Sequence, residues 1–409
     1  MTPNNSTDAI IASTLSNLAR NRIVINPQYL SDDNLPEAER RAILDEIFNR
    51  NIREKQVATV VNHLASILVG RHPQSLLVYG PTGSGKTVTM IHVLSSLQRV
   101  ANHKGVKLRY SYVDITQPKS VFGAFNELAI SLDSRVKRYK KGIPVDYMQS
   151  MIIEAMEKLD GFLCLLIDEV DNIKPRPDDL LVFLSKTLPR RVPCRLVIIM
   201  LTNRLDWERG LDPRIMSCLK KNDILFDPYN AIDLLEILKL RVSKALDASK
   251  VDAAALRKIA AYASKETGDA RKAVELLVKA VRVAEESSGQ LTEREVDLAE
   301  ERIELDKSEE LIQSLATQQY LALLACYGSF EGGVRKISTG EAYEVYRRIC
   351  ERESTSALSQ RRFSDIIGFL DLYGLVNARV VTKGRYGNTR EISSALPPQV
   401  AKRCFNRHL

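Results

Sequence analysis

The stretch Gly80-Pro81-Thr82-Gly83-Ser84-Gly85-Lys86-Thr87 has the form G-x-x-x-x-G-K-T and directly follows the apolar run of residues 76–79. A buried strand, a glycine-rich turn and a helix (here residues 88–94) is the order that phosphate binding requires, because glycines let the backbone curl with its N–H groups pointing inward. Lys86 can then reach the β- and γ-phosphates of a nucleotide, and the Thr87 hydroxyl can ligand Mg²⁺. An ordinary glycine turn is the alternative. The flanking strand and helix favour a nucleotide-binding site.

Strands and helices alternate around this motif. Apolar runs predict strands at residues 76–79, 108–114, 162–167, 195–201 and 223–226. The third run is apolar throughout, as expected of a parallel strand that is buried on both faces. The pattern predicts an α/β fold with a doubly wound parallel sheet, whose ligand site lies at the carboxyl ends of the strands.

The chain after Pro228 has a different character, with three helical patterns within residues 230–286 and almost no strand signal. Residues 293–310 are highly charged and predict a connecting helix or linker. Beyond them we predict helices at residues 311–326, 339–353 and 359–373, and strands at residues 376–382 and 389–393. Three helices followed by a glycine-tipped hairpin is the layout of a winged helix-turn-helix, an α+β domain.

Composition bounds the class of protein. The chain has 409 residues, of which 44% are hydrophobic and 27% charged, which is ordinary for a soluble globular protein of two to four domains. No apolar run approaches the roughly 20 residues of a membrane span, and the N-terminus lacks the pattern of a signal peptide. The six cysteines occur with no C-x-x-C pair, so neither a zinc site nor a disulfide framework is indicated. We therefore expect an intracellular protein in a reducing environment, with no membrane partner.

Positive charge is concentrated toward the C-terminus. The net charge is +8, and from Glu310 to the end fourteen Lys and Arg stand against nine Asp and Glu. A basic terminal domain on a chain that binds ATP indicates nucleic acid as a partner. A solvated basic face is the alternative, and charge alone does not decide between them.

Polar residues follow two of the predicted strands. Asp168 can hold Mg²⁺ through its water shell, because Mg²⁺ prefers oxygen ligands and keeps several waters. Glu169 can polarise the attacking water as a general base, and Asn203, after the next strand, can orient that water. A surface turn is the alternative in both places. The phosphate loop upstream favours the catalytic interpretation.

Two arginines are candidates for contacts with the γ-phosphate. Arg214 follows Leu211-Asp212-Pro213 and can reach a nucleotide on a neighbouring subunit, whereas Arg271 begins a helix and is available to a phosphate bound by its own chain. Each alone is more often a solvated side chain. As a set with the phosphate loop and the acidic pair, they support an ATPase.

In sequence and spacing this set resembles that of the AAA+ ATPases. The Walker A motif is residues 80–87, Walker B is residues 165–169, sensor 1 is Asn203, the box-seven arginine is Arg214 and sensor 2 is Arg271. The resemblance implies a RecA-like base with a helical lid, the cofactors ATP or ADP and Mg²⁺, and weak ATP hydrolysis that acts as a switch. The implied catalytic residues are Glu169, Asn203 and Arg214, and the implied metal ligands are Thr87 and Asp168.

Within that superfamily the chain resembles the archaeal origin-recognition initiators, relatives of the eukaryotic Orc and Cdc loader subunits. The resemblance begins at about residue 23 and includes residues 224–229, 360–367 and 384–392. In that family Tyr229 and Arg241 correspond to nucleotide-contacting positions. The cofactor-binding residues so implied are Gly80, Thr82, Gly83, Ser84, Gly85, Lys86, Thr87, Val88, Tyr229, Arg241 and Arg271.

The chain departs from that family in one place and carries the family's insert in another. An extra charged helix at residues 37–49 separates Tyr29-Leu30 from Arg53-Glu54, two motifs that lie close together in the family. Residues 116–143 occupy the place of an insert that contacts DNA, and they include Lys119 and the basic run of residues 135–141.

The C-terminal domain carries the other predicted DNA contacts. Residues 359–373 are expected to form the recognition helix, since a helix fits the major groove with its N-terminal residues at bases or phosphates. A wing suits phosphates or the minor groove. A winged helix used for protein contacts is the alternative. The predicted DNA-binding residues are Gln360, Arg361, Arg362 and Ser364 on the helix, and Lys383, Arg385, Tyr386 and Arg390 on the wing.

The resemblance implies an ATP-dependent initiator that binds double-stranded replication-origin DNA and helps recruit or load the replicative MCM-type helicase, with other initiator copies as further partners. An ATP-switched transcriptional regulator and a clamp-loader-type ATPase are the alternatives. The expected domains are a flexible segment at residues 1–22, the AAA+ base at 23–228, the lid at 229–304 and the winged helix at 305–409.

Overall fold

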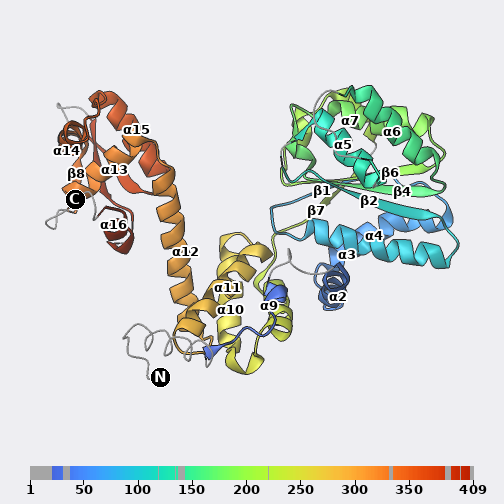
Figure 1. The fold of residues 1–409 in the computed structure, drawn as a ribbon, viewed down its shortest axis with the longest axis horizontal. Coiled ribbons are helices and arrows are strands. Elements are labelled where there is room, and N and C mark those ends of the chain that lie inside the picture. Colours follow the sequence, from blue (N-terminus) through green and yellow to red (C-terminus); the bar gives the residue numbers. More distant parts are fainter. Residues whose placement is uncertain are drawn as a thin grey trace, which may run out of the picture. The chain divides into compact units, whose positions relative to one another are not determined.

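A computed structural model of the chain (Figure 1) describes residues 21–30, 37–117, 119–133, 135–136, 143–219, 221–330, 335–382, 388–396 and 398–405. The chain divides into two compact units, Met1–Val296 and Asp297–Leu409. The predicted N-terminal segment lies outside the described residues as far as residue 20. Within the described residues, no helix is both long and apolar enough to cross a membrane.

The first unit contains a five-stranded parallel sheet with the order β2-β4-β6-β1-β7. The strands are β1 (Ser75–Tyr79), β2 (Leu108–Asp114), β4 (Phe162–Asp168), β6 (Arg195–Thr202) and β7 (Lys221–Leu225). All five predicted strands are present, and only β7 is displaced, since it begins two residues before the prediction. The order places β1 between β6 and β7, although β6 follows β1 by more than a hundred residues.

Helices cover both faces of this sheet (Figure 1). They are α5 (Val121–Leu132), α6 (Val145–Glu157) and α7 (Asp178–Val182) on one face, and α3 (Glu54–Leu64) and α4 (Lys86–His103) on the other. Neighbouring strand residues point to opposite faces, so Leu77 packs with the first group and Leu76 with the second. Strand β4 is buried along its whole length, as predicted.

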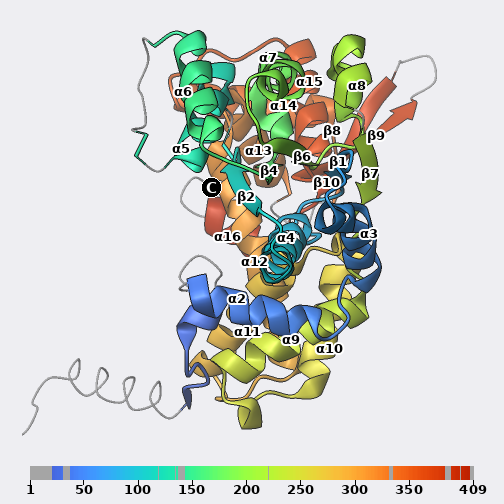
Figure 2. The same cartoon turned by 90° about the vertical axis from the view of Figure 1, so that its right-hand side faces the viewer.

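Three helices follow the sheet, α9 (Ala231–Ala245), α10 (Ala253–Glu266) and α11 (Ala270–Glu286). The first residues of the predicted base hydrogen-bond to α11, because the N–H groups of Ile23 and Val24 both donate to the Glu285 carboxylate. The predicted extra helix is present as α2 (Glu37–Phe48). Just after it, Arg50 pairs with Glu236 of α9 at 3.0 Å, so this stretch lies beside α9 (Figure 2).

The second unit has the predicted winged-helix layout. Its elements are α13 (Thr317–Ser329), β8 (Ile337–Ser338), α14 (Thr339–Arg352), α15 (Gln360–Leu372), β9 (Val376–Thr382), β10 (Asn388–Ser394) and α16 (Pro398–Phe405). Strand β10 lies between β8 and β9 in a small antiparallel sheet. The rings of Tyr346 and Phe363, with centroids 4.8 Å apart, hold α14 against α15 in the core.

The helix predicted at residues 311–326 is wrong as a single element. Helix α12 (Glu293–Ser314) continues four residues past the predicted connector, and α13 begins only at Thr317. The chain turns at Ala316, which is extended and whose N–H donates to the Gln319 side chain at 3.1 Å. No glycine or proline marks this break, and the N-cap position is the poor capping residue Ala316, so apolar spacing alone runs across it. Strand β8 and helix α16 were also absent from the prediction.

Candidate functional site

The phosphate loop joins β1 to α4 in the conformation that its glycines allow. Gly83 and Gly85 have φ angles of 70° and 83°, in the left-handed region that favours glycine. A Cβ atom on Gly83 would lie 1.7 Å from Asp269 Oδ1, and one on Gly85 would lie 2.1 Å from the Tyr229 hydroxyl. The glycines are therefore required by the shape of the loop and by the residues that pack on it.

The Lys86 ammonium is held inside this loop. Its Nζ donates to the carbonyl oxygens of Gly80 and Pro81, at 2.8 and 2.9 Å, and to Asn203 Oδ1 at 2.8 Å. Burial lowers the pKa of Lys86 to about 8, although the nearby carboxylates, Asp168 first, act to raise it. The side chain is thus still a cation at neutral pH and is positioned at the mouth of the loop.

The strand order explains which residues meet at this edge of the sheet. Strand β6 lies between β4 and β1, so Asn203, directly after β6, falls between Glu169, after β4, and Lys86. Asn203 joins the two: its Oδ1 accepts from Lys86, and its Nδ2 donates to Glu169 Oε1 at 3.3 Å. The structure therefore brings together three predicted residues that are up to 117 positions apart.

A hydroxyl and a carboxylate form the second part of the site. The Thr87 hydroxyl donates to Asp168 Oδ2 at 2.7 Å, and the Tyr112 hydroxyl donates to the same oxygen at 3.1 Å. Tyr112 was not predicted as a site residue. Its only signal in the sequence is its place near the end of a predicted strand, which many structural tyrosines share.

Glu169 is fixed through both of its carboxylate oxygens. Its backbone is left-handed, with φ 51°, and its Oε2 accepts from Asn172 Nδ2 at 2.7 Å while Oε1 accepts from Asn203. Asn172 also donates to the carbonyl oxygen of Ile115 at 3.1 Å, which anchors it to the end of β2. Burial, together with repulsion from Asp168, raises the pKa of Glu169. Sequence reasoning missed Asn172, because an Asn three residues after an acidic pair carries no signal of its own.

These residues fit a magnesium–nucleotide complex. The Ser84 hydroxyl is buried in the phosphate loop and has no hydrogen-bond partner among the described residues, so a polar ligand at the loop would satisfy it. Thr87 and Asp168 supply the oxygen ligands that Mg²⁺ prefers. Lys86 adds a cation for phosphate oxygens.

The predicted arginines differ in their surroundings. Arg271 is the second residue of α11, and the N–H of the residue before it, Ala270, donates to the Gly83 carbonyl oxygen of the phosphate loop at 3.2 Å. Arg214 is the second residue of α8 (Pro213–Leu219), and its side chain is 89% exposed. Arg241 is buried and donates to the carbonyl oxygen of Tyr29 at 2.9 Å. Tyr229 is also buried, with its hydroxyl against Gly85.

Helix α15 presents the predicted recognition residues. Ser359 caps it by accepting from the Arg362 N–H, and Phe363 and Ile367 are buried in the core. This leaves Gln360, Arg361 and Arg362 exposed on its first turn, with Ser364 partly buried.

Arg390 lies against α15 rather than extending from the wing. Its Nη1 donates to the Ser364 carbonyl oxygen at 2.9 Å, and a Cβ atom on Gly368 would lie 2.8 Å from this nitrogen. The other predicted wing residues, Lys383, Arg385 and Tyr386, lie outside the described residues.

The predicted insert is described in part. Lys119, in the two-residue strand β3 (Lys119–Ser120), pairs with Glu127 at 3.0 Å, and Arg135, 80% exposed, pairs with Asp133 at 2.7 Å. Residues 137–141 of the basic run lie outside the described residues. Helix α5, within the insert, packs in the core of the first unit.

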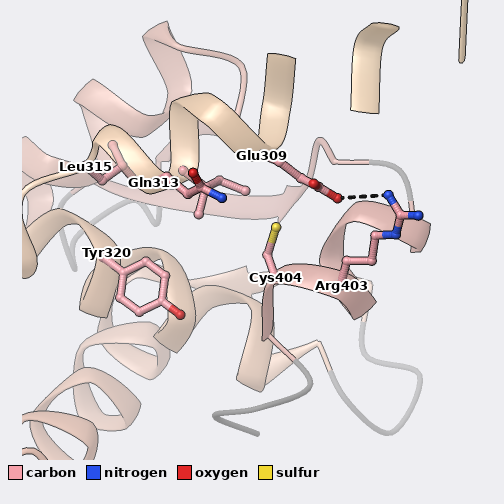
Figure 3. Close-up of a pocket in the computed structure, with 7 residues that line it drawn as sticks. Glu309, Gln313, Leu315, Tyr320, Arg403 and Cys404 are labelled. Carbon is pink, nitrogen blue, oxygen red and sulfur yellow. Dashed lines mark hydrogen bonds and ion pairs between the residues drawn. The ribbon is translucent and has the colours of Figure 1, made fainter. Parts of the chain in front are cut away.

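A cavity of about 480 Å³ lies elsewhere, within the second unit (Figure 3). The end of α12, the start of α13 and α16 line it, and Arg403 pairs with Glu309 at 3.3 Å beside Cys404. None of its lining residues belongs to the set predicted from the sequence.

Three family models match successive parts of the chain. They are an AAA ATPase domain at residues 52–199, a Cdc6 AAA+ ATPase-type lid domain at residues 235–301 and a CDC6 C-terminal winged helix domain at residues 310–403. In order, they correspond to the sheet, to α9–α11 and to the second unit. The predicted fold class, an AAA+ base with a helical lid and a winged helix, is confirmed.

Relatives match over nearly their whole length. The ORC1-type DNA replication protein of Thermococcus kodakarensis is 33% identical over 360 residues, covering 87% of this chain and 86% of the relative. The ORC1-type DNA replication protein 1 of Sulfurisphaera tokodaii is 33% identical over 389 residues, covering 95% and 94%. The solved structure of the Aeropyrum pernix ORC1 protein in complex with DNA has a TM-score of 0.66 and 29% identity, covering 94% of this chain and 97% of that chain.

Proposed function

Because the chain belongs to the family of ORC1-type DNA replication proteins, we propose that it is an ATP-dependent initiator that binds double-stranded replication-origin DNA. It binds the duplex through the winged helix and the AAA+ insert, and it helps recruit or load an MCM-type helicase. Weak ATP hydrolysis acts as the switch, and further copies of the initiator bind the same origin.

One observation carries the ATP-dependent part of this proposal. The contacts from Lys86 through Asn203 to Glu169 stand beside the Thr87–Asp168 pair at one edge of the sheet. A cation, an amide and a general base in a row match what the hydrolysis of a terminal phosphate requires.

Each side chain has a role in the proposed reaction. Lys86 binds phosphate oxygens, and Thr87 and Asp168 hold Mg²⁺, which supplies charge neutralisation when it is bound. Glu169 accepts a proton from water, helped by a pKa that burial raises, and Asn203 keeps that carboxylate in place. Arg271 acts on the nucleotide of its own chain. Arg214, which is exposed, acts on a nucleotide of a neighbouring copy.

The DNA-binding part rests on the second unit and on similarity to a relative. Gln360, Arg361 and Arg362 are exposed on the first turn of α15, where a recognition helix meets base edges or phosphates. The relative from Aeropyrum pernix was solved with DNA and shares 29% of aligned residues with this chain.

The test is binding of the full chain, with ATP or ADP, to three duplexes of equal length: the replication origin of its source, a promoter from the same genome and a shuffled sequence. We expect the origin to bind most tightly at physiological salt. In a pull-down, the origin duplex should also retain a purified MCM-type helicase only when the full chain is present. Equal affinity for all three duplexes would contradict origin recognition, and a promoter preference would favour a transcriptional regulator.

A further inference from the structure

Arg53 is a buried arginine to which the proposed chemistry gives no role. It lies between α2 and α3 with φ 63° and ψ 23°, a left-handed conformation that non-glycine residues keep only where their surroundings hold them. Its side chain is buried, although arginine is among the residues least often found in a protein interior. Both its backbone and its side chain are therefore fixed by neighbouring groups.

Those neighbours belong to two different parts of the nucleotide site. Arg53 Nη2 donates to the Ser84 carbonyl oxygen at 2.8 Å and to the Asp227 carbonyl oxygen at 2.5 Å. The guanidinium carbon also lies 3.9 Å from the centre of the Tyr229 ring. One nitrogen thus joins the phosphate loop to the connector between β7 and α9.

The first of these contacts orients a peptide group of the phosphate loop. The C=O and N–H of a trans peptide point in opposite directions. Because the Ser84 carbonyl points toward Arg53, the Gly85 N–H points away from it, as phosphate binding by loop N–H groups requires. The Tyr229 hydroxyl occupies the space beside Gly85, which keeps this part of the loop packed.

The positive charge of Arg53 also favours the binding of a phosphate at this loop. Among the described residues, its contacts are to carbonyl oxygens and aromatic rings, and none is to a carboxylate. A buried cation that no anion neutralises, and that water screens poorly, favours an anion bound nearby.

The lid reaches the same turn independently. The Ala270 N–H, at the start of α11, donates to the Gly83 carbonyl oxygen at 3.2 Å, and Asp269 packs on Gly83. Gly83, Ser84 and Gly85 are therefore each contacted by the lid, by Arg53 or by the connector.

We propose that Arg53 is a positioning residue that couples the phosphate loop to the lid connector, so that nucleotide affinity depends on where the connector lies. This inference rests on the proposed nucleotide binding. A nucleotide that organises the loop will, through Arg53, also hold the connector at Asp227–Tyr229.

The test compares three variants of the full chain by calorimetric titration with ADP. Arg53→Gln removes the charge and the two hydrogen bonds to the Ser84 and Asp227 carbonyl oxygens. Arg53→Lys keeps the charge but not the planar guanidinium group. Arg50→Gln is the matched control. Arg50 lies three residues away and pairs with Glu236 and Glu46 on the surface. We expect the ADP Kd to rise about tenfold or more in Arg53→Gln, the usual effect of losing charge-assisted bonds. Arg53→Lys should lie between this value and the wild type, and Arg50→Gln should match the wild type.

Protein that has unfolded irreversibly lowers the stoichiometry of binding, whereas a reversibly unfolded fraction raises the apparent Kd in inverse proportion to the folded fraction. Circular dichroism at the titration temperature must therefore show that each variant is folded before its Kd is compared. An Arg53→Gln Kd within twofold of the wild-type value would therefore overturn the proposal. A wild-type chain that does not bind ADP would overturn the nucleotide site itself, which is a separate result.

If Arg53→Gln does not fold, the ADP Kd of Arg53→Lys decides the matter, and a value within twofold of the wild type would overturn the proposal. Hydrogen exchange of the wild-type chain, with and without ADP, should show residues 83–87 and 226–230 gaining protection together. Protection confined to the phosphate loop would mean that the connector is not coupled to it.

Discussion

The proposed nucleotide site and the proposed recognition helix present their positive charges in opposite ways. Lys86 is buried, and its ammonium donates to three oxygen atoms of the same chain, whereas Arg361 and Arg362 are exposed on the first turn of α15. In the first region the position of each group is set by contacts within the fold. In the second region the arginine side chains are exposed to solvent on the surface of the helix. Single substitutions should accordingly be severe in the first region and graded in the second.

The largest effect is expected at Lys86. Lys86→Ala should abolish ATP and ADP binding, because the phosphates lose their ammonium partner. Lys104→Ala, at the exposed end of the same helix, is the matched control and should bind as the wild type does. Titration calorimetry measures both, and nucleotide binding by Lys86→Ala would show that the buried site is not decisive.

The next effect separates binding from chemistry within the buried region. Glu169→Gln should keep nucleotide but slow hydrolysis by about a hundredfold or more, the usual contribution of a general base. Single-turnover measurements on bound ATP report the chemical step directly. Glu157→Gln, an exposed glutamate at the end of α6, should hydrolyse ATP at the wild-type rate. Equal rates in the two variants would remove Glu169 from the role of base.

Two arginines of the first unit test whether the exposure of a side chain determines the effect of its substitution on ATP hydrolysis. Arg271→Ala should slow hydrolysis about tenfold even in a monomer, because Arg271 directly follows Ala270, which contacts the phosphate loop of its own chain. Arg214→Ala should match the wild type in dilute, monomeric protein and lose activity only where copies assemble, because its side chain is exposed. A defect of Arg214→Ala in the monomer would mean that it does not act between subunits.

Graded effects are expected on α15. Arg361→Ala and Arg362→Ala should each weaken origin binding several-fold. If each contacts one phosphate, the slope of log affinity against log salt should also fall by about 0.9 for each substitution. Arg257→Ala, on the exposed face of α10, is the control. Arg135→Ala, in the insert, should lower the slope further if the insert grips the same duplex, whereas an unchanged slope would confine binding to the second unit.

The smallest effect follows from the titration of Lys86. Burial lowers its pKa to about 8, so the cation that receives the phosphates is lost from the nucleotide-free chain as pH rises through 8. ADP affinity should therefore be about twofold lower at pH 8 than at the acid limit and should fall further toward pH 9. Lys86→Arg, which does not titrate in this range, should give a flatter profile if it still binds. An affinity that increases between pH 7.5 and 9 would contradict the assignment.

The sequence specifies the buried region more fully than the surface. The phosphate loop and the acidic strand end were predicted residue by residue, because phosphate and metal binding allow few residue types at fixed spacing. Contacts between distant segments could not be predicted, since they depend on strand order. The motifs assign Asn203 and Lys86 to one site, but apolar spacing does not say that β6 lies beside β1, so the direct hydrogen bond between the two side chains was not predicted.

Other features escaped because their signals are local or absent. Asn172 and Arg53 act through contacts that fix other groups, and residue type alone does not reveal such a role. The break between α12 and α13 has no breaker residue. Arg390 lies on the wing strand β10, as predicted, and the contact of its guanidinium with the Ser364 carbonyl oxygen of α15 was not foreseen.

The pairing of Gly368 with Arg390 has an evolutionary consequence. A methyl group at position 368 would collide with the end of a flexible side chain and leave the backbone undisturbed, so Gly368→Ala can be accepted by the fold. Its effect would be to release the guanidinium from the Ser364 carbonyl oxygen. If the wing contacts DNA as proposed, a substitution on α15 would then alter a contact made from β10. This consequence requires Arg390 to be present. In a chain that has already lost Arg390, a substitution at position 368 has no guanidinium to release.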